Sequence, residues 1–327
     1  MGTASQSSRG EPGRREGQTF EHRGSRWLVY VNFVKLPHTL FTLPFALVGV
    51  VLASYRAPVS WGALGWVVLA FTCARFAAMG FNRIVDRAID ARNPRTQRRE
   101  IPSGALRVTE AVVTVGVASI LFVVSAWQLN RLCGLLSPLA LSWVLFYSFT
   151  KRFTQWCHIV LGVGMSIAPV GGYLAVTGAW SDPWWMLIAL ALGVATWGAG
   201  FDVLYALQDI DFDRSLSLHS IPAALGPRRA LFIARALHVT TVLCLAAVGA
   251  ATFTGTHAGS FFAAGVVVTA GLLLYEHSLV KHDDFSKLNA AFFTMNGVIS
   301  VAFFASALLE RLVHTNPVVL AFLRTAR

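Results

Sequence analysis

Two groups of acidic residues, each placed where a long apolar segment ends, carry the clearest chemistry in this sequence. In the first group, Asn82, Asp86 and Asp90 follow one another at steps of four residues. Residues four apart lie on one face of a helix, about 5–6 Å apart between their Cβ atoms, so these side chains are predicted to form one row of oxygen atoms. The two like charges on that row repel each other, which favours a bound cation.

The second acidic group begins with Asp202, which directly follows apolar residues. Steps of seven and then four residues place Asp202, Asp209 and Asp213 on one predicted helix face, with Asp211 turned aside. Asp202 is expected near membrane depth, where an ionisable group is costly enough to indicate a function. A second row of oxygen atoms is therefore predicted.

Two such rows at the same membrane face suit a magnesium–diphosphate site. Mg²⁺ usually binds one or two carboxylates and completes its shell with water and substrate phosphate. Each row could hold one ion, and the two ions together could clamp a diphosphate. In the alternative interpretation the acids belong to a solvated loop and are neutralised by nearby arginines. These are Arg83, Arg87, Arg92, Arg95, Arg98 and Arg99.

Basic residues are predicted on the same side of the membrane. Tyr147, Lys151 and Arg152 close the fourth apolar segment, and Lys35 lies near the start of the first. Arginine can bind phosphate through two parallel hydrogen bonds, and lysine acts as a point charge. These residues could therefore contact a diphosphate. In the alternative interpretation they only mark membrane topology, or extend their charged ends to the membrane surface.

The elements that position these residues are predicted to be transmembrane helices. Of the 327 residues, 55% are hydrophobic and only 13% are charged, which indicates an integral membrane protein. A helix needs about 20 mostly apolar residues to cross a bilayer. Nine helices are predicted, at residues 28–54, 61–82, 108–129, 133–150, 156–178, 184–206, 229–253, 258–280 and 288–312.

The distribution of charge predicts the orientation of these helices. The sequence has 27 Lys and Arg against 16 Asp and Glu, a net charge of +11. Most of the basic residues lie before the first helix and in the links after the second, fourth and sixth. Since such residues concentrate in cytoplasmic loops, the N-terminus and both acidic groups are predicted to be cytoplasmic. Topology thus explains the excess of positive charge, and no nucleic-acid partner is expected.

The domain organisation follows from the same apolar pattern. Residues 1–26 are polar and lack hydrophobic periodicity, which predicts a disordered cytoplasmic tail. Residues 27–312 are predicted to form one nine-helix membrane domain with little room for a soluble domain. Residues 313–327 would form a short C-terminal tail.

Four motifs occur in a characteristic order. They are Asn82-x3-Asp86-x3-Asp90, Tyr147-x3-Lys151-Arg152, Asp202-x2-Tyr205-Ala206-x2-Asp209-x3-Asp213 and His219-Ser220-Ile221-Pro222-x3-Gly226. Their order and spacing, together with the nine-helix layout, resemble the UbiA-type membrane prenyltransferases over about residues 30–312. Within that family the chain looks most like bacterial 4-hydroxybenzoate polyprenyltransferases. One departure is Arg83, where many members have Asp, so the first group has one carboxylate fewer.

The resemblance implies an all-α fold around a central cavity that is capped on the cytoplasmic side. It also implies two Mg²⁺ ions, one held by Asn82, Asp86 and Asp90 and the other by Asp209 and Asp213. The residues it implies as catalytic are Asp86, Asp90, Asp209 and Asp213. The residues it implies as substrate-binding are Lys35, Tyr147, Lys151, Arg152 and Asp202.

The implied activity is Mg²⁺-dependent transfer of a polyprenyl group from polyprenyl diphosphate to an aromatic acid, with 4-hydroxybenzoate as the expected acceptor. Electrophilic aromatic substitution of this kind would serve ubiquinone or menaquinone biosynthesis. It would take place in the inner (plasma) membrane, with membrane lipid around the protein and the active site on the cytoplasmic face.

Three alternatives remain open at this point. Sister enzymes prenylate naphthoate, haem or chlorophyll precursors. A cation transporter would carry its charges near the membrane midplane, within inverted repeats. A phosphotransferase that makes phospholipids would require a D-x2-D-G-x2-A-R run, which this sequence does not contain.

Overall fold

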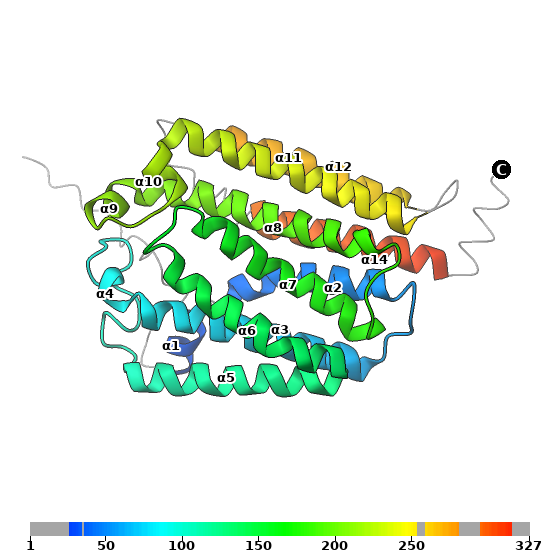
Figure 1. Ribbon diagram of the computed structural model, residues 1–327, viewed down its shortest axis with the longest axis horizontal. Helices are drawn as coiled ribbons and strands as arrows, with labels where there is room; N and C mark the ends of the chain where they lie inside the picture. Colours follow the sequence, from blue (N-terminus) through cyan, green and yellow to red (C-terminus); the bar gives the residue numbers. More distant parts are fainter. Residues whose placement is uncertain (1–25, 35, 254–258, 281–294, 316–327) are drawn as a thin grey trace, which may run out of the picture.

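Long apolar helices dominate the computed structural model, which describes residues 26–34, 36–253, 259–280 and 295–315 (Figure 1). No strand occurs in these ranges, and eight helices there are long and apolar enough to cross a membrane. A shorter apolar segment, Thr42–Ala53, lies in a further helix. The predicted all-helical membrane architecture is therefore confirmed.

The long helices run roughly alongside one another, and short helices join them at one end of the bundle (Figure 1). The long helices are α2 (Leu36–Ala53), α3 (Trp61–Val85), α5 (Val108–Leu129), α6 (Arg131–Thr150), α7 (Cys157–Thr177), α8 (Trp184–Ala206), α11 (Pro227–Thr252), α12 (Ser260–Leu279) and α14 (Asn296–Thr315). The short helices are α1 (Arg26–Phe33), α4 (Arg87–Asp90), the 3-10 turn η1 (Leu207–Asp209), α9 (Ile210–Ser215) and α10 (Ile221–Leu225).

The second to eighth predicted helices agree with α3, α5, α6, α7, α8, α11 and α12 to within three residues at each end. The ninth predicted helix overlaps α14, and its first residues lie outside the described part of the chain. The first predicted helix differs, because the structure divides it into α1 and α2. Pro37 lies in the first turn of α2, where its missing N–H removes no hydrogen bond and proline is favoured, so a new helix starts here.

Helix α8 lies in the middle of the packing and holds many of the fully buried side chains, including Trp197 and Leu204. It packs against α7 on one side and α11 on the other. At the contact with α7, a Cβ added to Gly162 would lie 2.1 Å from the carbonyl oxygen of Ala195. Small residues allow helices in membranes to approach this closely. This contact therefore holds the first turns of α7 against the middle of α8.

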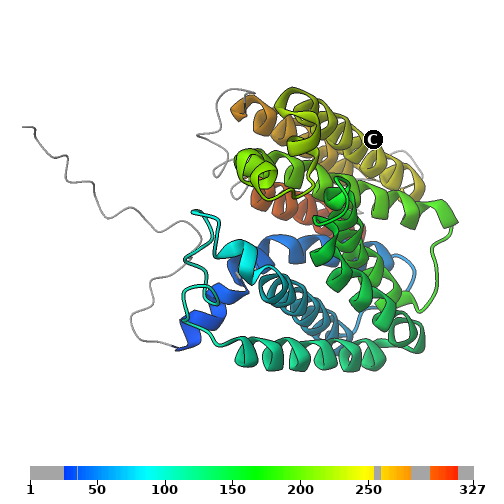
Figure 2. The ribbon, with the colours of Figure 1, turned by 60° about the vertical axis from the view of Figure 1, so that its left-hand side comes forward.

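The short helices α4, α9 and α10 gather at one end of the bundle, and Figure 2 shows the cyan α4 and the yellow-green α9 on the same side of it. The acidic groups of the sequence lie at this end, because α3 runs into α4 and α8 runs through η1 into α9. Outward faces elsewhere carry large apolar side chains, such as Phe232, Val267 and Leu274, that are more than two-thirds exposed. Such faces suit contact with lipid.

Candidate active site

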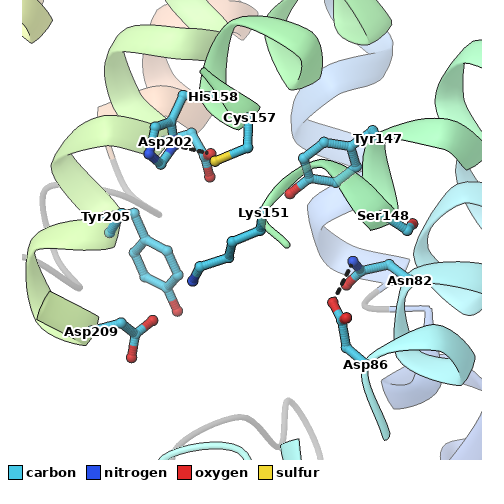
Figure 3. A pocket seen from close by; sticks show the side chains of 11 residues that line it. Asn82, Asp86, Tyr147, Ser148, Lys151, Cys157, His158, Asp202, Tyr205 and Asp209 are labelled. Carbon is cyan, nitrogen blue, oxygen red and sulfur yellow. Dashed lines mark hydrogen bonds and ion pairs between the residues drawn. The ribbon is translucent and has the colours of Figure 1, made fainter. Parts of the chain in front are cut away.

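One pocket opens at the end of the bundle where the short helices lie (Figure 3). It has a volume of about 100 Å³. Figure 3 shows Asn82 and Asp86 on one side, Tyr205 and Asp209 on the other, and the side chain of Lys151 between them. The lining residues come from α3, α6, α7, α8 and η1 and the turns that follow them. They are Asn82, Asp86, Tyr147, Ser148, Lys151, Cys157, His158, Asp202, Tyr205, Ala206 and Asp209.

The first acidic group begins at the end of α3. The amide of Asn82 donates to Asp86 Oδ2 at 3.0 Å, and the guanidinium of Arg152 donates to Asp86 Oδ1 at 3.0 Å and to the carbonyl of Val85 at 2.9 Å. Burial raises the pKa of the Asp86 carboxyl above its ordinary value, although the hydrogen bond from Arg152 works in the opposite direction. Asn82 and Asp86 therefore face the pocket as an amide–carboxylate pair.

Asp90 does not share this position. Helix α3 ends at Val85, and Asp86 has the torsions φ −91° and ψ 6°, so the chain changes direction before Asp90. The Asp90 carboxylate is buried, and Arg99 Nη1 donates to both of its oxygens at 2.9 and 2.8 Å. The expected row of three oxygen-bearing side chains is therefore reduced to two in the pocket.

Arg83, the departure from the family pattern, points away from the pocket. Its guanidinium forms a buried ion pair with Glu100 and lies 5.9 Å from the ring centre of Phe33. Both charged residues of this pair are almost fully buried. Arg83 thus adds no positive charge to the pocket, and its role here is to fix the loop after α4 against α3.

The second acidic group is also divided. Asp202 and Asp209 line the pocket, whereas Asp213 is fully buried outside it. Lys151 Nζ lies 2.7 Å from Asp213 Oδ1, and the hydroxyl of Ser220 donates to Asp213 Oδ2 at 2.9 Å. The repeat of seven and four residues fails because α8 tightens into the 3-10 turn η1, in which successive residues are rotated further around the axis.

An arginine from the loop after α4 covers Asp209. Arg95 Nε and Nη2 donate to the two carboxylate oxygens of Asp209 at 3.2 and 2.6 Å, and Arg95 Nη1 donates to the hydroxyl of Tyr205 at 3.0 Å. The amide of Asn93 also donates to Asp209, at 3.4 Å. Neutralisation by nearby arginines, the alternative interpretation of the acids, is therefore part of this structure, through Arg95 and Arg99.

Lys151 is the central cation of the pocket. Burial alone would lower the pKa of its amine, but the carboxylates of Asp213 and Asp209 outweigh burial and raise that pKa. The amine is thus held in its charged form. Tyr147 lines the pocket beside it, while Arg152 reaches the pocket only through Asp86. Lys35 lies outside the described residues.

A histidine that the sequence did not single out supports Asp202. His158 Nδ1 lies 2.6 Å from Asp202 Oδ2, and the backbone N–H of Ile221 donates to His158 Nε2 at 3.3 Å. His158 is only 2% exposed. The available signal was one polar ring at the start of an apolar helix, which by itself does not indicate a partner 44 residues away.

A second residue not singled out is Arg75, an arginine inside the apolar part of α3. It precedes Asn82 by seven residues, which places it on the same helix face and about 10 Å further along the helix. Its Nε is buried and has no hydrogen-bond partner among the described residues. It interacts electrostatically with Tyr147, which lines the pocket. A cation is therefore placed deeper in the bundle than Asn82 and Asp86.

Comparison with known proteins identifies the family. The family model described as "UbiA prenyltransferase family" matches residues 42–306. The chain belongs to the UbiA prenyltransferase family. The predicted membership is confirmed, and so is the prediction that the chain is a prenyltransferase enzyme in a family of multi-pass membrane proteins.

Curated relatives of this UbiA family member carry the name 4-hydroxybenzoate octaprenyltransferase. The protein of that name from Tolumonas auensis is 29% identical over 236 residues, which are 71% of this chain and 80% of the relative. The one from Aliivibrio salmonicida is 28% identical over 252 residues, which are 76% of this chain and 86% of the relative.

Solved structures show the same fold. The apo structure of a UbiA homolog from Aeropyrum pernix K1 is 32% identical, with a TM-score of 0.73, and the match covers 84% of this chain and 98% of that one. A UbiA homolog from Archaeoglobus fulgidus bound to DMAPP and Mg²⁺ has a TM-score of 0.69 at 20% identity, and the match covers 87% of this chain and 99% of that one.

The pocket of this UbiA family member can be tested for its fit to Mg²⁺. Within the described ranges, no group of three or more His, Cys, Asp or Glu side chains lies close enough to hold a metal ion. The pocket offers Asn82 and Asp86 on one side and Asp209 on the other. Mg²⁺ needs only one or two carboxylates when phosphate and water supply its other ligands. The donor set therefore fits an ion that arrives with a diphosphate.

Proposed function

We propose that this UbiA family prenyltransferase transfers a polyprenyl group from polyprenyl diphosphate to 4-hydroxybenzoate, as a step of ubiquinone or menaquinone biosynthesis. The pocket carries the proposal, because Lys151 lies there between the carboxylates of Asp86 and Asp209. Such an arrangement suits a diphosphate together with a divalent ion. The names of the curated relatives support 4-hydroxybenzoate as the acceptor.

Asn82 and Asp86 would hold one Mg²⁺ and Asp209 a second. The ions would neutralise the charge of the departing diphosphate. Asp213 would contribute indirectly, because it binds Lys151, which lines the pocket, and Asp90 would do so by binding Arg99 of the loop after α4. The Archaeoglobus fulgidus homolog with DMAPP and Mg²⁺ supports a divalent ion in this fold.

The cations of the site would bind the phosphate groups. Arg95 and Arg152 now donate to Asp209 and Asp86, and each can turn its planar fork to phosphate oxygens once a metal ion occupies the carboxylates. Lys151 would add a point charge between them. Tyr147, next to Lys151 in the lining, would contact the substrate as well.

Arg75 would bind the carboxylate of the aromatic acid. A buried arginine within an apolar helix is costly and calls for an anionic partner. Arg75 lies on the Asn82 face of α3, and its Nε lacks a partner within the described part of the chain. An acceptor held there would have its ring between Arg75 and the diphosphate. This position supports an aromatic acid as the acceptor.

The reaction would begin when the bond between the allylic carbon and the diphosphate oxygen breaks, with its electron pair leaving on the diphosphate. The ring carbon ortho to the phenol hydroxyl then bonds to the allylic carbon, and the ring loses its proton. Tyr205, whose ring already faces a cation at 5.2 Å, can stabilise positive charge through its π face. The surrounding helices would exclude water from the cation.

The finer topology is part of the same proposal. Counting α2, with its apolar segment Thr42–Ala53, nine helices would span the membrane. The end that carries α4, α9 and α10 is rich in arginine, so it would face the cytoplasm, as would the N-terminus. Residues 27–312 would form one domain of the inner (plasma) membrane. The predicted tails, 1–26 and 313–327, lie outside the described residues except for Arg26, which begins α1, and residues 313–315, which end α14.

The test is product mass spectrometry on the full-length protein in lipid nanodiscs. A polyprenyl diphosphate, Mg²⁺ and a panel of aromatic acids would be supplied, with a chelator as control. Chelator-sensitive prenylation of 4-hydroxybenzoate is expected. Prenylation of a naphthoate or of another acceptor instead would contradict the substrate assignment, and no prenylation by folded protein would contradict the proposed reaction.

A further inference from the structure

We propose that Asp202 is the base that removes the ring proton, and that His158 is a positioning residue that holds the Asp202 carboxylate for this step. The inference rests on the proposed function, because it assigns a step that function requires. The other acids of the site are paired with arginine or lysine, and the proposed function assigns the removal of the ring proton to none of them. Four observations support the assignment.

The first observation is the place of the two residues relative to the pocket. Asp202 lines the pocket, and its side chain is 21% exposed, whereas the side chain of His158 is 3% exposed and lies behind it (Figure 3). The distance from His158 Nδ1 to Asp202 Oδ2 is 2.6 Å. Since His158 engages one carboxylate oxygen, the other oxygen can face the substrate.

The second observation fixes where the imidazole proton lies. The backbone N–H of Ile221 donates to His158 Nε2 at 3.3 Å, so Nε2 must carry a lone pair. In a neutral ring the proton then lies on Nδ1, from which it is donated to Asp202. The hydrogen-bond network thus assigns one tautomer, which orients the carboxylate without taking its negative charge away.

The third observation separates Asp202 from the other acids of the site. A cationic side chain contacts Asp86, Asp90, Asp209 and Asp213, and in each case the partner is arginine or lysine. Donors contact both carboxylate oxygens of each of these four acids. In place of an arginine or lysine, Asp202 has the imidazole of His158, which contacts its Oδ2. Asp202 is therefore the pocket carboxylate whose second oxygen can face the substrate.

The fourth observation concerns depth in the bundle. Asp202 on α8 precedes Asp209 of η1 by seven residues, and Arg75 precedes Asn82 by seven residues on α3. Seven residues of helix are about 10 Å, so Asp202 and Arg75 lie at similar depth, beyond the diphosphate end. An aromatic acid bound by Arg75 would present its ring at this depth, where Asp202 lines the pocket.

A short segment, residues 219–221, connects the proposed base with the diphosphate end. The N–H of His219 donates to the carbonyl of Lys151 at 2.8 Å. The hydroxyl of Ser220 donates to Asp213 at 2.9 Å, and the N–H of Ile221 is the one that donates to His158. The orientation of His158 is thus set by the same segment that contacts Lys151 and Asp213.

The proposed step is balanced in atoms and electrons. After the carbon–carbon bond has formed, the ring is a cation with hydrogen and prenyl group on the same carbon. The carbon–hydrogen bond breaks, its electron pair restores the aromatic ring, and the proton goes to the carboxylate of Asp202. The Asp202 carboxylic acid then returns this proton to water or to the released diphosphate, while the Nδ1 proton of His158 stays in place.

The experiment compares 4-hydroxybenzoate with and without deuterium at the ring positions ortho to the hydroxyl. In Asp202→Asn, kcat is expected to fall by about 100-fold or more, and deuterium is expected to slow the remaining turnover about twofold or more beyond its effect on the wild type. In His158→Leu a fall of about tenfold to 100-fold with the same rise in isotope effect is expected, because the carboxylate is displaced. The KM for polyprenyl diphosphate should stay near the wild-type value in both variants.

Two further variants serve as rescue and control. His158→Asn has an amide nitrogen near the position of Nδ1, so it can donate to Asp202 and should restore much of the rate and the wild-type isotope effect. Ser166→Ala, on the same helix, removes a buried hydrogen bond that stays within α7, and it should change neither quantity. A drop in His158→Leu without a change of isotope effect would mean that His158 only supports the fold, and would overturn its assignment.

The outcomes also separate this inference from the proposed function. If the wild-type protein prenylates 4-hydroxybenzoate but Asp202→Asn keeps its rate and isotope effect, the base is another group and the inference fails alone. If folded wild-type protein prenylates no aromatic acid, the proposed function fails and the inference with it.

Discussion

Arg95 donates two hydrogen bonds to Asp209 across 114 residues of sequence, at 2.6 and 3.2 Å. Both side chains are partly buried, and the contact joins the loop after α4 to η1. This pair brings the two acidic groups of the sequence to opposite sides of one pocket. Replacement of Arg95 offers a direct test of whether Asp209 is a metal ligand.

The variant Arg95→Ala should lower the stability of the metal-free protein by about 1–3 kcal/mol, because the partly buried Asp209 carboxylate loses two charged hydrogen bonds. Added Mg²⁺ should raise the melting temperature more in this variant than in the wild type, since no guanidinium has to be displaced. Thermal unfolding in one detergent, with and without MgCl₂, measures both effects. An equal or smaller response to Mg²⁺ would argue against a metal ion at Asp209.

Asp86→Ala and Asp209→Ala should each reduce kcat/KM by about 100-fold or more, because each removes a carboxylate that would stabilise the charge of the diphosphate and its ion. Asp211→Asn is the matched control. It changes an exposed acid two residues from Asp209 and should leave kcat/KM within the error of the assay. Full activity in either alanine variant would exclude that residue from the site.

Asp86→Asn should stabilise the fold at neutral pH although it removes activity. Burial raises the pKa of Asp86 in the folded protein, so the charged form costs folding free energy at any pH above that raised pKa. The gain from Asn should shrink as the pH falls through the raised pKa, because Asp86 itself then becomes neutral. Melting temperatures of both proteins across a pH series, with Asp211→Asn alongside, provide the measurement. A gain that grows toward acid pH would contradict the assigned direction.

Gly162→Ala should prevent normal packing of α7 on α8. The added Cβ would lie 2.1 Å from the carbonyl oxygen of Ala195. The other atoms nearest to it are also backbone atoms of α8, which cannot turn aside as a flexible side chain can. Since this contact lies one turn from His158, activity and folded yield should fall together. Gly171→Ala, on the same helix, meets nothing within 4 Å and should be tolerated. Size-exclusion profiles and activity of the two variants decide the matter.

Glu310→Gln should weaken the protein without changing its kinetics. The carboxylate of Glu310 accepts backbone N–H groups of Gly259, Phe261 and Phe262 at 2.8, 2.7 and 3.2 Å, at the start of α12. Loss of a charged cap of this kind costs about 1 kcal/mol. A lower melting temperature with unchanged kcat is expected, since α12 does not contribute to the pocket. A change in kcat would indicate coupling between α12 and the site.

The sequence predicted the long helices well because apolar length is a local property. The bounds of α8 agree at both ends with the predicted 184–206. The rows of acids were less accurate, since a four-residue spacing implies one face only while the helix continues. Asp86 and Asp209 stand where helices end, and distant side chains such as Arg152 and Arg95 hold those ends. No local pattern contains that information.

The pairing of Asp86 with Arg152 and of Asp209 with Arg95 has a consequence for what can enter the pocket. A lone divalent cation would have to evict Arg152 or Arg95 into a site with no anion to receive it. A lone diphosphate would draw the guanidinium groups away and leave Asp86 and Asp209 facing each other uncompensated. A ligand that brings a divalent cation together with a diphosphate gives the carboxylates and the guanidinium groups new partners at the same time. We therefore expect the resting protein to ignore free metal ions and free diphosphate at concentrations where it captures their complex.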